Sequence, residues 1–238
     1  MFETVRQDHR PTGRGDTTRE RILEVALGLF RKRGFEPTTM RDIARASKLS
    51  LGAAYYYFPS KEALVHAFYD RVQDEHAALI RATCASSADL VVRVRAALVG
   101  KLDVLREDRA LLGALFRYVG ERDHPLSVFS AATRGQREQA VATFSLALEG
   151  SRLPKALHEA AARALWLAHL GLIIYFIHDG SDEQARTKRL AGRMSEVFCA
   201  ALRLVTLPGV GYVVTPALAA LREAGLISSS PMKRRVSV

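Results

Sequence analysis

Apolar residues recur at helical spacing along most of the chain. The first stripe falls on one face of a helix and comprises Ile22, Val25, Ala26, Leu29 and Phe30. Asp16, Thr17 and Thr18 are suitable N-caps for this helix, and Arg31-Lys32-Arg33 followed by Gly34 marks its end. The pattern therefore predicts an N-terminal helix of about four turns that buries a single face.

Two short helices are predicted next, separated by a tight turn at Lys48-Leu49-Ser50. Thr38 or Thr39 caps the first, and its inner face is formed by Met40, Ile43 and Ala44. Ser50 caps the second, which consists of small residues and then tyrosines. Helices this short are marginal alone. Two of them joined by a turn and supported by a longer helix are typical of a helix-turn-helix unit.

The segment "AAYYYFPSKEAL" raises a question about its aromatic residues, because tyrosines and a phenylalanine lie beside Pro59, Ser60 and Lys61. At 100° per residue the three tyrosines cannot share one face of a helix. We expect Phe58, and in part Tyr56, to turn toward the core, and Tyr55 and Tyr57 to point outward. The alternative is that all three tyrosines fill the core. A long helix capped by Ser60 follows, with the stripe Leu64, Phe68 and Val72.

The rest of the chain also predicts helices, which gives an all-α fold. Their expected ranges are Ala88–Arg106, Arg109–Val119, Leu126–Leu148, Pro154–His178, Asp182–Val205 and a short Ala217–Ala224. Only Gly211–Val214 has a strand-like pattern, and it is too short to pair alone. The apolar run 160–177 is nearly long enough to span a bilayer, but it contains Arg163 and His169, which favours a helix buried on more than one side.

Charge and composition narrow the choice of partners. The formal net charge of +10 and pI of about 10.0 favour a polyanionic partner such as nucleic acid. Cys84 and Cys199 give neither a zinc spacing nor a disulfide framework, and no metal cluster, cofactor motif or catalytic constellation is evident. The polar N-terminus lacks the apolar core of a signal peptide, so a cytoplasmic location without a membrane is the default expectation.

Thr18 to Val72 resembles the DNA-binding domain of TetR-type transcriptional regulators. The resemblance follows an ordered set of motif residues: Ile22, Ala26, Phe30, Gly34-Phe35, Thr38-Thr39, Asp42-Ile43-Ala44, Ser50-x-Gly52, Tyr55-x-Tyr57-Phe58 and Lys61-Glu62-x-Leu64. One departure is Lys48, which replaces the usual turn glycine, so either a strained turn or an added phosphate contact is expected. The resemblance implies a flexible arm (1–15), a helix-turn-helix domain (16–76), a helical ligand-binding and dimerisation domain (77–206) and a C-terminal extension (207–238).

The resemblance also implies roles for individual residues in binding a near-palindromic operator in double-stranded DNA. Thr39 and neighbouring amides would bind a phosphate, and Arg41 would reach a phosphate or a base edge. Leu51, Gly52 and Ala53, which follow the Ser50 cap, would face the bases, and backbone contacts would come from Tyr55, Tyr57 and Lys61. The arm's Arg6, Arg10 and Arg14 are a further hypothesis for minor-groove contacts.

For the larger domain the resemblance implies a homodimer and a pocket for a small organic effector. The stripe expected to face the partner subunit comprises Leu190, Met194, Val197, Ala201 and Leu202. Candidate pocket residues are Phe116, Tyr118, Trp166, His169 and Ile173, although plain core packing explains these side chains as well. The sequence thus favours a ligand-responsive repressor. A sequence-neutral DNA-binding protein and a helical enzyme remain the alternatives.

Overall fold

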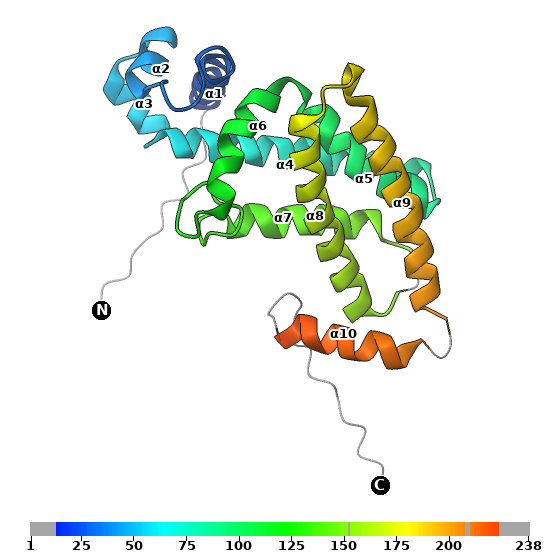
Figure 1. The fold of residues 1–238 in the computed structure, drawn as a ribbon. Coiled ribbons are helices and arrows are strands. Elements are labelled where there is room, and N and C mark those ends of the chain that lie inside the picture. Colours follow the sequence, from blue (N-terminus) through cyan, green and yellow to red (C-terminus); the bar gives the residue numbers. More distant parts are fainter. Residues whose placement is uncertain (1–12, 152, 208–209, 224–238) are drawn as a thin grey trace, which may run out of the picture. The chain divides into compact units, whose positions relative to one another are not determined.

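A computed structural model of the chain describes residues 13–151, 153–207 and 210–223, and all the regular secondary structure in these ranges is helical (Figure 1). The α-helices are α1 (Gly13–Arg33), α2 (Met40–Ala46), α3 (Leu51–Tyr57), α4 (Lys61–Ser86), α5 (Leu90–Val104), α6 (Arg109–Phe116), α7 (Arg134–Ala147), α8 (Lys155–His178), α9 (Ala185–Val205) and α10 (Gly211–Glu223). Short 3-10 helices are η1 (Arg106–Asp108), η2 (Arg117–Gly120) and η3 (Asp182–Gln184). The predicted all-α class is confirmed.

The chain forms two compact units, divided within α4. The first unit, the head, ends at Phe68, and the second, the body, begins at Tyr69. The sequence-based boundary at residue 76 lies farther along the same helix, because a continuous helix carries no break that would mark the change of unit.

The head has a core assembled from one face of each of its helices. From α1 it takes Ile22, Ala26 and Phe30, as the stripe predicts, together with Leu23 and Leu27, whereas Val25 and Leu29 are only half-buried. Helix α2 buries Met40, Ile43 and Ala44, as expected. Helix α4 buries Leu64 and Phe68 in the head and Val72 in the body. The helix boundaries at Thr39, Ser50 and Ser60 also agree with the predicted caps.

The turn between α2 and α3 requires a left-handed residue at Lys48, where φ is 54°. The Lys48 N–H donates to Arg45 O at 3.1 Å and the Leu49 N–H to Ala44 O at 2.9 Å, so both amides close the end of α2. A lysine thus occupies a left-handed conformation that favours glycine, as the departure from the usual turn glycine led us to expect.

The body combines the C-terminal part of α4 with α5 to α10, and within it α7 packs on α8 and α5 packs on α9 (Figure 1). Among the described residues, α8 alone is long and apolar enough to cross a membrane, and 44% of its most apolar window is buried within the body. It also packs against α6 and α9. These contacts fit a core helix that keeps one face uncovered.

Three sequence-based boundaries were wrong. Residues 126–133 form turns rather than the first part of α7, because the Ser127 hydroxyl donates to Val119 O at 3.1 Å and the Thr133 hydroxyl donates to Ser127 O at 2.6 Å. Such side-chain bonds compete with a helical backbone. Helix α1 begins at Gly13, before the expected caps at 16–18. The final helix, expected at Ala217–Ala224, spans Gly211–Glu223 as α10 and includes the strand-like Gly211–Val214.

Candidate nucleic-acid interface and ligand cavity

The first turn of α2 is held by a reciprocal cap. Thr39 Oγ1 accepts the Asp42 N–H at 3.2 Å, and Asp42 Oδ2 accepts the Thr39 N–H at 3.0 Å. Hydrogen bonds from the Thr39 side chain and backbone hold the pKa of Asp42 below its usual value. Thr39 is exposed, but its N–H and its hydroxyl both donate to Asp42 Oδ2, so an incoming phosphate would meet the amides of Met40 and Arg41.

Helix α3 presents small residues on its outer side. Ser50 Oγ accepts the Ala53 N–H at 3.1 Å and fixes the helix start. Gly52 is exposed, Leu51 and Ala53 are half-buried, and Ala54 is fully buried. The second helix of the unit is therefore anchored by one alanine in its middle and leaves its N-terminal turn accessible.

Side chains from α2 and α3 meet in one shallow surface hollow. Its lining comprises Thr39, Met40, Arg41, Leu51 and Tyr55. Thr39 and Tyr55 also line an adjoining hollow with Lys61. Residues that the sequence singles out separately on two helices thus form a continuous surface of the head.

The tyrosine run differs from the expectation at Tyr56, which was expected to turn partly inward, and in part at Tyr57, which was expected to point outward. Tyr56 is 77% exposed and Tyr55 47% exposed, while Tyr57 is half-buried and Phe58 is fully buried. The prediction that Tyr56 turns partly inward was wrong. Ala54 and Phe58 are four residues apart and define the buried face, so Tyr56, midway between them, must point away from it. Tyr56 is consequently an exposed aromatic residue that sequence reasoning assigned to the core.

Lys61 has an internal role in addition to its position beside the hollow. Its Nζ donates to Phe35 O at 2.8 Å and to Glu36 O at 3.1 Å, and it lies 4.4 Å from the centroid of the Phe35 ring. These bonds tie the first turn of α4 to the loop after α1. Two of the three ammonium N–H groups are therefore occupied within the head.

Exposed cations surround the α2–α3 surface, namely Arg41, Arg45 and Lys48. The arm residues Arg6 and Arg10 lie outside the described residues, and nothing is described of the Arg14 side chain. Helix α1 carries further exposed cations of the head, among them Arg31, Lys32 and Arg33.

The body contains a cavity of about 90 Å³ between α4, α5, α6, α7 and α8. This is several times the roughly 15 Å³ that a single water requires. Four of the candidate ligand residues line it, namely Phe116, Trp166, His169 and Ile173. Tyr118 is outside this lining: it is buried and its ring stacks on His124 with centroids 3.9 Å apart.

Sequence reasoning missed the charged and amide groups of the cavity, which include Gln73, Lys101 and Arg137. Lys101 is buried, and burial lowers its pKa to about 7. Its Nζ donates to Gln73 Oε1 at 2.8 Å. A lysine interrupting the apolar run "ALVGKLDVL" was the available signal, but a helix surface explains such a residue equally well.

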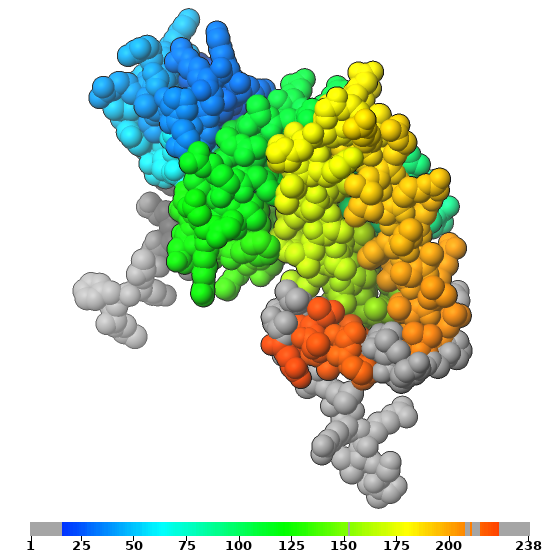
Figure 2. Space-filling view, in the orientation of Figure 1, coloured from blue at the N-terminus to red at the C-terminus, as the bar shows by residue number. Residues whose placement is uncertain are grey.

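Helices α8 and α9 are neighbours on the face of the body seen in Figure 2, and their exposed side chains form an uncovered apolar face. Its exposed members are Leu167, Ile174, Tyr175, Leu190, Val197 and Leu204. Leu190, Val197 and Leu204 recur every seven residues, as in helices that pack side by side. Of the predicted stripe, Leu202 is instead buried within the body, while Ala201 is exposed and Met194 half-buried.

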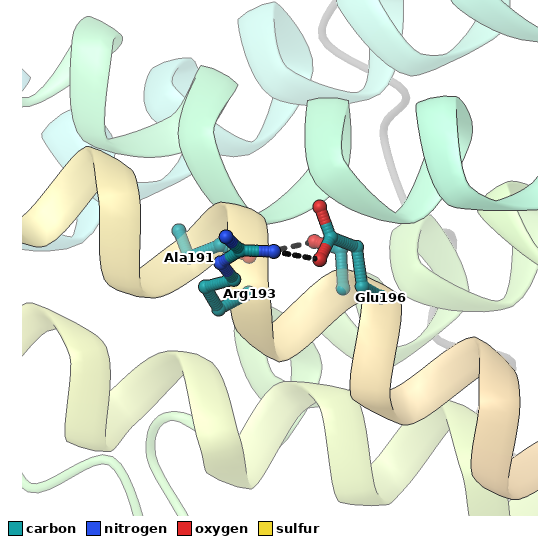
Figure 3. Close-up of polar contacts among 4 residues, drawn as sticks. Ala191, Arg193 and Glu196 are labelled. Carbon is teal, nitrogen blue, oxygen red and sulfur yellow. Dashed lines mark hydrogen bonds and ion pairs between the residues drawn. The ribbon is translucent and has the colours of Figure 1, made fainter.

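A charged pair lies next to Val197 on α9. Arg193 and Glu196 form an ion pair (Figure 3), with Nη1 and Oε2 2.8 Å apart and both side chains exposed. On the opposite, buried side the Ser195 hydroxyl donates to Ala191 O at 2.7 Å. Helix α9 thus has a satisfied inner face and an outer face that combines apolar residues with a polar edge.

Comparison with known proteins agrees with the helix-turn-helix geometry of the head. Residues 22–68 match the family model described as bacterial regulatory proteins, tetR family. The regulator YuxN of Bacillus subtilis is 46% identical over 54 residues, 21% of this chain and 19% of YuxN. UidR of Escherichia coli K12 is 41% identical over 81 residues, 34% of this chain and 37% of UidR. The chain thus matches well under half the length of these curated relatives.

Solved structures resemble a larger part of the chain. Salmonella enterica GusR superimposes with a TM-score of 0.61 at 23% identity, covering 81% of this chain and 98% of GusR. Thermus thermophilus FadR gives a TM-score of 0.57 at 23% identity, covering 75% of this chain and 93% of FadR. These likenesses concern the fold. With the head's helix-turn-helix geometry, the family match shows that residues 22–68 carry the DNA-binding domain of the tetR family, and the solved structures extend the likeness in fold over most of the chain.

Proposed function

We propose that this protein is a repressor that binds a near-palindromic operator in double-stranded DNA as a homodimer and is released by a small organic effector. The observation that carries the proposal is the common surface of Thr39, Arg41, Leu51 and Tyr55 on α2 and α3. This surface offers the Tyr55 hydroxyl and the Arg41 guanidinium to DNA phosphates. Beside them, the N-terminus of α3 has small side chains, including a glycine, and can enter the major groove. At the edge of this surface, two further groups contact the DNA backbone. They are the side chain of Tyr57, which is half-buried on α3, and the remaining N–H of Lys61.

Readout of bases would rest on few hydrogen bonds. Leu51 and Ala53 offer apolar contacts suited to thymine methyl groups, and Gly52 permits close approach. Arg41 is the exposed residue of this surface with bidentate hydrogen-bonding capacity. Tyr56, on the same helix α3, is exposed and offers an aromatic side chain to the DNA as well.

The uncovered face of α8 and α9 supports the homodimer. Leu167 and Ile174 are 42% and 48% exposed, and Val197 is 69% exposed. Two copies of this face would form a four-helix bundle around a two-fold axis, with the Arg193–Glu196 pair at its rim. A dimer would present two heads to two half-sites on one DNA duplex.

The cavity of the body supports an effector site. FadR of Thermus thermophilus, which shares the fold, was solved in complex with lauroyl-CoA. In this chain α4 runs from the head to the cavity lining, since it begins at Lys61 and contributes Tyr69, Val72 and Gln73. Ligand would favour a population in which α4 moves and the spacing of the two heads no longer fits the operator. The protein would act in the cytoplasm, where the DNA is.

A gel-shift titration with the DNA upstream of the protein's own gene tests the proposal. The wild-type dimer is expected to bind one two-fold symmetric site in this DNA. Arg41→Ala is expected to weaken this binding at least about tenfold. Arg122→Ala removes an exposed arginine of the body and should leave affinity unchanged.

Equal affinity for scrambled DNA of the same length would instead favour the sequence-neutral alternative. Tyr55→Phe provides a milder test, because it removes one hydroxyl and keeps the ring. Affinity unaffected by both Arg41→Ala and Tyr55→Phe would contradict the assignment of this surface.

A further inference from the structure

The cavity contains a buried cation without an acidic partner. Lys101 is 7% exposed in the middle of α5. Its Nζ has one polar partner among the described residues, Gln73 Oε1 at 2.8 Å, and no carboxylate of those residues is within ion-pair distance. An ammonium carries three N–H groups. Two of them therefore remain unsatisfied in a place where isolated charge is costly.

A second unsatisfied polar side chain lines the same cavity. His169 on α8 is 1% exposed, and neither of its ring nitrogens has a hydrogen-bond partner. Its ring stacks on His76 at a centroid distance of 6.5 Å, and His76 itself is bonded to Ala97 O at 2.9 Å. Burial, followed by the charge of Lys101, lowers the pKa of both histidines. Neutral His169 thus retains one free N–H donor.

Lys101 is the buried cation of the cavity, whereas the other cation of the lining, Arg137, is only half-buried. Arg137, which also lines it, donates from Nη1 to Val128 O at 2.7 Å and to Ser130 O at 3.3 Å. Its guanidinium is thereby directed to the backbone of the 126–133 turns. Most other lining side chains are apolar, among them Leu112, Phe116 and Trp166.

We propose that the effector is a small organic monocarboxylate, with its carboxylate bound by Lys101 Nζ and the His169 ring and its apolar body against Phe116, Trp166 and Ile173. This inference rests on the proposed effector-responsive function and specifies the ligand class. Protonated Lys101 balances one negative charge, and the bound carboxylate in turn favours the protonated form of the lysine. A phosphate dianion or a polyanionic thioester would bring excess charge into an apolar cavity.

Binding is tested with acid and amide pairs of equal shape, using 4-phenylbutyrate against 4-phenylbutanamide and octanoate against octanamide. Isothermal titration calorimetry on the full chain reads binding directly, without DNA. At least one acid is expected to bind about tenfold or more tightly than its amide, because the amide lacks the charge that pairs with Lys101.

Lys101→Met is the informative variant, because methionine preserves length and apolar packing at a buried site. It should abolish the preference for acid over amide while the amide still binds. Lys155→Met, which removes an exposed lysine at the start of α8, is the matched control and should keep the preference. Retained acid preference in Lys101→Met, or no acid preference in the wild type, would overturn the proposal.

Lauroyl-CoA is included as a third probe, and tighter binding of lauroyl-CoA than of both acids would also overturn it. The gel shift with upstream DNA, run on the same preparations, separates the two proposals. Specific DNA binding without a preference for acid over amide would contradict the carboxylate assignment and leave the proposed regulatory function standing. A preference for acid over amide without specific DNA binding would contradict the proposed regulatory function and leave the carboxylate site standing.

Discussion

Asp179 accepts two hydrogen bonds from Thr187, one from its backbone N–H at 2.9 Å and one from its hydroxyl at 2.7 Å. The other carboxylate oxygen accepts the N–H and hydroxyl of Ser181 at 2.9 and 2.7 Å. The carboxylate thereby joins the end of α8 to the first turn of α9. Because these two helices carry the uncovered apolar face, Asp179 sets the geometry on which the proposed dimer depends.

Asp179→Asn should therefore lower the thermal midpoint by several degrees at neutral pH, since an amide NH₂ cannot accept the bonds that a carboxylate oxygen accepts. The hydrogen bonds from Ser181 and then Thr187 hold the pKa of Asp179 well below its ordinary 3.8. Its contribution is thus present above pH 4 and is lost as the pH falls below that value. Differential scanning fluorimetry between pH 3 and pH 7 measures both effects.

The matched control for this variant is Asp182→Asn, which changes an exposed aspartate of η3. It should leave the midpoint within about one degree of wild type. A midpoint in Asp179→Asn equal to that of Asp182→Asn would show that the α8–α9 connection does not depend on this carboxylate.

Lys101 should make the protein more stable as the pH rises above neutrality. Its pKa is lowered from 10.5 to about 7 by burial, so between these values the unfolded chain binds the extra proton and unfolding becomes less favourable with increasing pH. Lys101→Met lacks this dependence. The free energy of unfolding of wild type should gain roughly 2 kcal/mol relative to Lys101→Met between pH 7 and pH 9.

Urea denaturation of the two proteins at pH 7, 8 and 9 measures that difference. His76 and His169, which face the same region, are neutral throughout this range because their pKa values are lowered. A constant difference between wild type and Lys101→Met across the series would mean that Lys101 keeps its proton in the folded chain.

Val197→Glu should separate the subunits of the proposed dimer. Val197 is 69% exposed on α9, at the middle of the heptad-spaced residues, and a carboxylate there would be buried without a partner in each subunit. We expect the dimer dissociation constant to rise at least about 100-fold by sedimentation equilibrium. Val92→Glu, at a 45% exposed position on α5, serves as the control and should not change it. Unaltered association of Val197→Glu would place the interface elsewhere.

Lys48 offers a separate test of strain and charge in the turn. With φ at 54°, glycine should be better tolerated there than alanine, so Lys48→Gly should be about 1 kcal/mol more stable than Lys48→Ala. Both variants lack the ammonium. If Lys48 contacts a phosphate, both should bind operator more weakly and with a shallower salt dependence than wild type. Equal stability of the two variants would contradict strain, and unchanged salt dependence would contradict the phosphate contact.

Local signals in the sequence predicted the head well. Thr39, Ser50 and Ser60 cap the helices assigned to them, and Met40, Ile43 and Ala44 are buried as their spacing indicates. Caps, turns and helical faces depend on residues within a few positions of one another, so local sequence patterns predict them. The same holds for Lys48, whose left-handed backbone follows from its place in the turn.

The tertiary structure decided what depends on distant segments. It turned Tyr56 outward, because the buried face of α3 is fixed by Ala54 and Phe58 against other helices. It kept residues 126–133 out of α7 through hydroxyl bonds back to Val119 and Ser127. It also enclosed Lys101 with Gln73 and His169, which lie 28 and 68 positions away in the chain. Whether a charge is buried depends on which helices cover it, and no local pattern encodes that.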